Sequence, residues 1–149
     1  MSINVLWVEE EPQSLRYERK LAEQQGWNIT SADTVSRAME LINDTAFDLV
    51  VVDLILPSND FHKQRGYVTP DAGIQFIEAI REPTRKGNTP ANVPLLVVTA
   101  VVSPEQKARV VKKLTSDQYY LTKPLREDVC RNVFIELTQA LDPSARNLL

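Results

Sequence analysis

The feature that most constrains the fold is an uninterrupted apolar run, Leu49-Val50-Val51-Val52, which ends in Asp53. The run is mostly β-branched and has no polar alternation, so it is typical of a parallel strand buried on both faces of its sheet. In open α/β sheets, ligands bind in the crevice beyond the carboxyl ends of the strands. The run therefore predicts a doubly covered parallel sheet, with the carboxylate of Asp53 at the edge where ligands bind.

Three other apolar segments also end in side chains that carry a charge or a hydroxyl group. Glu9 and Glu10 follow Val5-Leu6-Trp7-Val8, Thr99 follows Leu95-Leu96-Val97-Val98, and Lys123 follows Tyr119-Tyr120-Leu121-Thr122. Because parallel strands end at the same edge of their sheet, we expect these groups to meet Asp53 there. Crowded carboxylates repel each other unless a cation joins them, and Mg²⁺ prefers oxygen ligands. The pattern predicts a site for phosphoryl and metal chemistry.

The rest of the chain alternates between helical and strand patterns. Helices are predicted after Pro12, from about Thr34, around Ile74 to Ile80, from Ser103-Pro104-Glu105-Gln106, and from about Arg126 to Leu141. Trp27-Asn28-Ile29-Thr30 predicts a short strand near a sheet edge. Such alternation is typical of a parallel sheet with helices on both faces. We expect one doubly wound α/β domain over residues 1–142, and a tail or the start of a linker over 143–149.

Composition and charge exclude several classes of protein. The net charge of −3 provides no basic surface for direct contact with nucleic acid. No apolar run approaches the length of a membrane helix, and the N-terminus lacks a signal-peptide pattern, so no membrane contact is expected. The single Cys130 cannot form an internal disulfide, and we expect a cytoplasmic location.

Four segments together resemble the motifs of one family. They are Val8-Glu9-Glu10-Glu11-Pro12, Asp48-Leu49-Val50-Val51-Val52-Asp53-Leu54, Val98-Thr99-Ala100 and Tyr120-Leu121-Thr122-Lys123-Pro124. In this order, and each at a strand end, they make the chain similar to the receiver domain of bacterial two-component response regulators over nearly its whole length. The resemblance implies a flavodoxin-like receiver fold, in which five helices flank a five-stranded parallel sheet.

The resemblance also implies an activity and a role for each residue of the site. Receivers accept a phosphoryl group onto one aspartate from a sensor histidine kinase or a phosphotransfer protein, with Mg²⁺, and so change their binding surface. By this resemblance the chain is a signalling module and not an enzyme. Asp53 would be the phosphoacceptor, Thr99 and Lys123 would contact the phosphoryl oxygens, and Tyr120 would be the switch residue. The implied Mg²⁺ ligands are Glu9, Glu10, Asp53 and the backbone carbonyl of Ile55.

The resemblance is incomplete at the predicted metal site. Glu9 and Glu10 stand where the family usually has two aspartates. Because glutamate is one methylene group longer, either the carboxylate must fold back or the metal must shift by on the order of 1 Å. A degenerate receiver that binds proteins without phosphorylation therefore stays open, as does a purely structural ion pair between Asp53 and Lys123. A small enzyme, such as an aspartate-dependent phosphatase, is disfavoured because Leu54-Ile55 follows Asp53, with no second catalytic aspartate two positions on.

Two connections, residues 58–71 and 83–92, are longer than in most receivers. Long loops in compact domains are often functional. Since the first of them follows the strand that bears Asp53, it is a candidate to overhang the acidic site, with Phe61 and Tyr67 as anchors. The alternative is a solvated surface excursion.

The last helix also predicts a contact surface. At about 100° per residue, Val129, Val133, Leu137 and Ala140 share one face, whereas Ile135 falls among polar residues on the outward side. Receivers commonly form dimers or bind partners through the last two helices and strand five. We therefore expect a homodimer or partner contact there, centred on Ile135.

Overall fold

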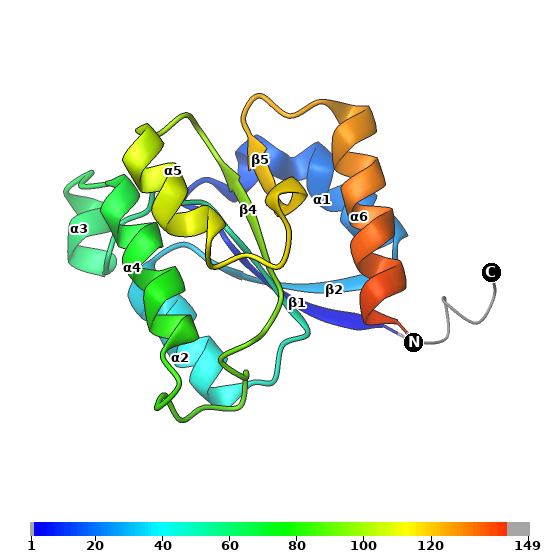
Figure 1. The fold of residues 1–149 in the computed structure, drawn as a ribbon. Coiled ribbons are helices and arrows are strands. Elements are labelled where there is room, and N and C mark those ends of the chain that lie inside the picture. The colour runs from blue at the N-terminus through cyan, green and yellow to red at the C-terminus, as the bar shows by residue number, and fades with distance from the viewer. Residues whose placement is uncertain (1, 143–149) are drawn as a thin grey trace.

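The protein is a three-layer α/β structure with helices on both faces of one parallel sheet (Figure 1). The structure, a computed structural model, describes residues 2–142. The sheet has the strand order β2-β1-β3-β4-β5. Its strands are β1 (Ile3–Val8), β2 (Trp27–Ala32), β3 (Leu49–Val52), β4 (Leu95–Thr99) and β5 (Tyr120–Thr122). The predicted doubly wound fold is confirmed, and the predicted tail over 143–149 lies outside the described residues.

Six α-helices connect and cover the strands, one more than expected. They are α1 (Arg16–Gln24), α2 (Val35–Asp44), α3 (Asp60–Gln64), α4 (Pro70–Arg81), α5 (Pro104–Val111) and α6 (Glu127–Leu141). Short 3₁₀ turns span Pro12–Leu15 and Asp117–Tyr119. The additional helix is α3, which lies within the long connection at 58–71. Among residues 2–142, no helix combines the length and the apolar character needed to cross a lipid bilayer.

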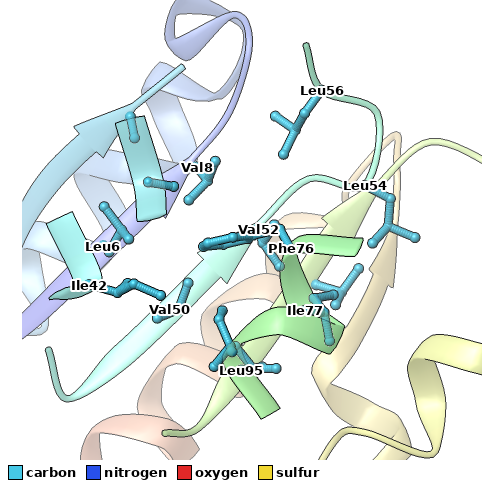
Figure 2. Close-up of a cluster of buried hydrophobic side chains, with 14 of the residues drawn as sticks. Leu6, Val8, Ile42, Val50, Val52, Leu54, Leu56, Phe76, Ile77 and Leu95 are labelled. Carbon is cyan, nitrogen blue, oxygen red and sulfur yellow. The ribbon is translucent and has the colours of Figure 1, made fainter. Parts of the chain in front are cut away.

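Alternate residues of each strand supply the two halves of the core. One face of the sheet packs against α2, α4 and α5, and Figure 2 shows its centre, where Leu6, Val50 and Val52 face Ile42 and Phe76. The other face packs against α1 and α6, with Trp7, Val51 and Phe134 among its largest side chains. All four residues of β3 are fully buried, as the continuous apolar run predicted.

The helix ends follow the expected capping chemistry. The Thr34 hydroxyl accepts from the backbone N–H of Arg37 at the start of α2. Ser103 and Gln106 form a capping box at the start of α5. Gly26 adopts a φ of 87° after α1, a conformation that favours glycine.

The inward face of α6 was predicted only in part. Val133 and Leu137 are buried as expected, but Val129 is 38% exposed and Ala140 is also exposed. Instead, Thr138 faces the sheet, because its hydroxyl accepts a hydrogen bond from the buried indole of Trp27 at 2.9 Å. The buried stripe is therefore rotated, and Ile135 is half-buried rather than fully outward.

The connection at 58–71 packs against the start of α2. Leu56 and Thr69 close its base as an antiparallel bridge. The carbonyls of Pro57 and Ser58 accept hydrogen bonds from Val35 and Ser36, at 3.1 and 2.9 Å, which satisfies unpaired N–H groups of α2. On α3, Lys63 Nζ lies 2.7 Å from Asp33 Oδ2.

The prediction that Phe61 and Tyr67 anchor this connection is wrong, because their side chains are 57% and 61% exposed. Their rings pack mainly within the connection itself, where His62 lies about 6 Å from both. Backbone capping and an ion pair, rather than buried aromatic side chains, hold this segment in place.

Candidate functional site

The predicted site residues come together where the chain reverses its direction of winding across the sheet. β1 pairs with β2 on one side and with β3 on the other, so the crossovers leave in opposite directions at this point. In doubly wound sheets this switch point forms the binding crevice. Glu9 directly follows β1 and Asp53 directly follows β3, and they are only 3% and 5% exposed.

Asp53 is hydrogen-bonded through both carboxylate oxygens. Its Oδ1 accepts from the Thr99 hydroxyl at 2.8 Å and from the Ile55 backbone N–H at 2.9 Å. Its Oδ2 accepts from Lys123 Nζ at 2.9 Å. Thr99 ends β4 and Lys123 follows β5, so adjacent strand ends supply these groups, as the sequence pattern predicted.

Lys123 also binds a second carboxylate. Its Nζ lies 3.1 Å from Glu9 Oε2, so one ammonium group bridges Glu9 and Asp53. Burial, followed by the charge of Asp53, raises the pKa of Glu9 to about 7, although Lys123 opposes the change. Burial lowers the pKa of Lys123, but its contacts with Asp53 and Glu9 outweigh burial and the pKa is raised overall. Two buried carboxylates thus share one positive charge.

The donor set fits a hard cation. Mg²⁺ typically binds through one or two carboxylates together with phosphate and water, and Glu9 and Asp53 provide two adjacent carboxylates. Burial first, and then the charge of Asp53, raises the pKa of Glu9, and a bound divalent cation would favour the charged form of this carboxyl group. Glu10 is half-buried, and within residues 2–142 no three ligating side chains are gathered into a ready-made metal cluster.

The predicted switch residue lies beside the site. Tyr120 begins β5 and is half-buried, and Lys107 Nζ from α5 lies 5.1 Å from the centre of its ring. This distance is within the range of a cation–π contact. Burial, and secondarily the charge of Asp53, raises the pKa of Tyr120.

One residue that shapes the site was not predicted. The backbone N–H of Gly73, in the first turns of α4, donates to the Leu54 carbonyl at 3.0 Å. A Cβ atom at position 73 would lie 2.4 Å from Leu54 Cα, so only glycine permits this close approach. A glycine inside a helical pattern is the sequence signal that could have identified it.

Comparisons with known proteins agree with this geometry. Residues 5–134 match the response regulator receiver domain family. The chain is 29% identical, over 135 residues, to the sensor histidine kinase GacS of Pseudomonas protegens, covering 90% of this chain and 13% of that protein. It is 25% identical, over 146 residues, to the signal transduction histidine-protein kinase BarA of Escherichia coli K12, covering 98% of this chain and 14% of that protein. The chain thus spans 13–14% of the length of these curated relatives.

Solved structures show the same fold. The receiver domain of the Francisella response regulator 1452 superposes with a TM-score of 0.69 at 22% identity, covering 95% of this chain and all of that one. A receiver domain protein from Methanospirillum hungatei also gives 0.69, at 17% identity, covering 99% of both chains. With the family match over most of the chain, these similarities identify the protein as a member of the response regulator receiver domain family.

Proposed function

We propose that this receiver domain accepts a phosphoryl group on Asp53 and thereby switches a protein-binding surface. The observation that carries the proposal is the hydrogen bonding of Asp53, whose two oxygens contact Thr99, Lys123 and the backbone of Ile55. A carboxylate held in this way is oriented for attack on phosphorus. The same hydroxyl, ammonium and N–H donors can then bind the phosphoryl oxygens.

Each residue of the site has a separate task in the proposed reaction. Asp53 supplies the nucleophilic oxygen, which bonds to phosphorus as the bond between phosphorus and the donor nitrogen breaks. Lys123 offsets the negative charge that the transferred group brings into the site. The Thr99 hydroxyl, which donates a hydrogen bond to Asp53 in this structure, would donate it to a phosphoryl oxygen instead. Tyr120 is the proposed switch residue, since it begins β5 and is half-buried.

Bound Mg²⁺ would neutralise charge as the two anions approach each other. Glu9 and Asp53 are its proposed side-chain ligands, assisted by Glu10 and the Ile55 carbonyl. Lys123, which already contacts Asp53, would contact the phosphoryl group carried by that residue.

The proposed phosphodonor is a sensor histidine kinase or a phosphotransfer protein, in keeping with the histidine kinases among the relatives. The proposed output surface comprises α5, β5 and α6, through which the domain would form a homodimer or bind a partner. A groove of about 180 Å³ between β5 and α6, lined by Tyr120, Leu125 and Val129 among others, supports this choice. We propose a cytoplasmic location, where such donors act, and no direct contact with nucleic acid or membrane.

A second candidate is a receiver that binds proteins without phosphorylation. The contact of Lys123 with both Glu9 and Asp53 favours it, because the amine already pairs the two buried carboxylates without a metal. In this case the site would serve stability rather than signalling.

Incubation with Mg²⁺ and acetyl phosphate, followed by intact-mass measurement, separates the two candidates. We expect an adduct of one phosphoryl mass on the wild type and none on Asp53→Asn. Asp48→Asn is a matched control, because Asp48 is exposed and lies at the opposite end of β3. A folded wild-type protein that remains unmodified would establish the phosphorylation-independent module.

A further inference from the structure

The second long connection, residues 83–92, is a fixed structure that packs on the end of α2. The N–H groups of Asn88 and Thr89 donate to the carbonyls of Asn43 and Ile42, at 3.1 and 2.9 Å. Thr89 is buried, and its hydroxyl accepts from the Phe47 N–H at 3.0 Å. These bonds satisfy carbonyls at the end of α2 and hold the connection in one conformation.

Arg81, the last residue of α4, links this connection to the end of α5. Its Nε donates to the Lys113 carbonyl at 3.1 Å, and its Nη1 donates to the carbonyls of Ala91 and Val93 at 2.8 and 2.6 Å. The guanidinium is therefore held in one orientation. Its Nη2 makes no hydrogen bond to any residue in the described part of the chain.

The charge of Arg81 has no acidic partner among residues 2–142. Burial lowers its pKa, with no carboxylate opposing the change. The neighbouring acid, Glu82, is exposed and accepts hydrogen bonds from Thr84 instead. Lys113 is half-buried and, within the same described residues, also forms no ion pair. Among the described residues, neither Arg81 nor Lys113 therefore has an acidic partner, and the two residues are joined through the Lys113 backbone carbonyl.

Arg81 and Lys113 are both among the residues that line a groove of about 370 Å³, and none of its lining residues is acidic. The other lining residues are Pro83, Ala91 and Leu114, which are apolar, and Asn92 and Thr115, which are polar. A guanidinium fork matches the geometry of a carboxylate or phosphate group. The apolar residues provide a surface for a short hydrocarbon segment.

The groove is separate from the site around Asp53. Gly73, near the start of α4, contacts Leu54 beside Asp53, whereas Arg81 ends the same helix. At a rise of about 1.5 Å per residue, these two positions lie roughly 12 Å apart along the helix axis. Figure 1 shows the connection after α4 turning beneath the sheet, beside α2. The phosphoryl chemistry proposed for Asp53 leaves the groove unused.

We propose that this groove binds a small organic anion, with its carboxylate or phosphate group on Arg81 Nη2 and Lys113 Nζ. The short apolar part of the ligand lies against Pro83 and Leu114, and Asn92 and Thr115 contact its polar end. The ligand class follows from two unpaired cations beside an apolar surface, and it holds whether or not Asp53 is phosphorylated.

Titration by ¹⁵N–¹H NMR at low ionic strength tests the proposal, with glutarate, inorganic phosphate and neutral glutaramide as probes. We expect saturable shifts at the amides of Asn92, Leu114 and Thr115, and at the Arg81 Nε–H. Glutarate should bind more tightly than phosphate, because it adds the apolar contact, and glutaramide should not bind. Shifts that do not saturate, or that glutaramide reproduces, would overturn the proposal. If phosphate binds as tightly as glutarate, the proposed apolar contact of the ligand with Pro83 and Leu114 is wrong.

Two lysine variants separate the groove from general electrostatic attraction. Lys113→Gln should weaken glutarate binding about tenfold, the loss expected for one charge-assisted hydrogen bond. Lys112→Gln removes the same charge from an exposed neighbour that does not line the groove, and it should leave the affinity unchanged. Equal weakening in both variants would contradict a defined site. Arg81→Gln should abolish binding, and Lys113→Gln remains decisive if loss of Arg81 unfolds the connection.

Discussion

Glu9 and Asp53 are held together by one cation, because each places a carboxylate oxygen within 3.1 Å of the Lys123 ammonium group. Both carboxylates are almost completely buried, whereas the lysine is partly open to solvent. Buried charges are tolerated only when they are paired and hydrogen-bonded. The stability of the site and its chemistry therefore depend on the same three side chains.

Removal of the shared cation should destabilise the metal-free protein. Lys123→Met leaves Asp53 without an ion-pair partner and raises the pKa of Glu9 further, so the folded variant must either bury two like charges or bind a proton. We expect the free energy of unfolding to fall by about 3 kcal/mol at pH 7.5. Urea denaturation in EDTA measures this change. Lys123→Met combined with Glu9→Gln should recover a substantial part of the loss, because only one buried charge remains. If the losses of stability caused by Lys123→Met and Glu9→Gln simply add in the double variant, Lys123 and Glu9 do not interact.

The raised pKa of Glu9 should make stability depend on pH in a defined direction. In the unfolded chain Glu9 loses its proton near 4.5, but in the folded protein it keeps the proton up to about 7. The folded state therefore binds more protons between these values, so the free energy of unfolding contributed by Glu9 falls as the pH rises through this window. The contribution is fully present below pH 4.5 and is lost above about pH 7.

Glu9→Gln removes this titration. In EDTA, its stability relative to the wild type should improve by on the order of 2–3 kcal/mol between pH 4.5 and pH 7.5. Glu10→Gln is the matched control, since it removes a carboxyl group from the neighbouring position, where Glu10 is half-buried and forms no ion pair with Lys123. If the free energies of unfolding of Glu9→Gln and the wild type differ by the same amount at every pH in this range, Glu9 does not have the raised pKa described above.

Substitution of Gly73 should perturb the backbone that follows Asp53. Gly73→Ala places a Cβ atom 2.4 Å from the Leu54 backbone, so α4 must move outward. We expect a destabilisation of about 1–3 kcal/mol by thermal or urea unfolding, although alanine ordinarily favours a helix over glycine. Gln75→Ala is exposed on the same helix and should be neutral or slightly stabilising. If Gly73→Ala and Gln75→Ala change the stability equally, the close approach of position 73 to Leu54 does not restrict the side chain at that position.

If Asp53 is phosphorylated as proposed, the phosphorylated state should be long-lived. Ile55 and Val101 lie two positions after Asp53 and Thr99, where receivers place side chains beside the path of the hydrolytic water, and neither can orient water. Ile55 is half-buried against the site, but Val101 is 80% exposed, so Ile55 should provide most of the protection. Ile55→Asn should accelerate loss of the phosphoryl group about tenfold or more, followed by intact mass in excess Mg²⁺. Wild-type decay within seconds, or an unchanged rate in the variant, would refute this account.

The buried sheet and the membership of the site could be predicted from the sequence. The apolar run of β3 has no polar alternation, and all four of its residues are fully buried. Glu9, Asp53, Thr99 and Lys123 reached the common edge, because parallel strands place their carboxyl ends side by side. Glu10, which was also expected there, is half-buried and forms no hydrogen bond or ion pair with these described residues. Capping residues such as Ser103 predicted helix starts because their hydrogen bonds are local in sequence.

The arrangement of groups from distant parts of the chain was decided only by tertiary packing. No local pattern shows that Lys123 bridges Glu9 and Asp53, that the carbonyls of Pro57 and Ser58 cap the start of α2, or that Thr138 faces Trp27 instead of solvent. The pKa of Glu9 likewise depends on burial by the surrounding fold and on the charge of Asp53. The periodicity of a sequence indicates which side chains face water and whether a segment forms a helix or a strand. The contacts named above depend instead on how helices and strands from distant parts of the chain pack together in the folded protein.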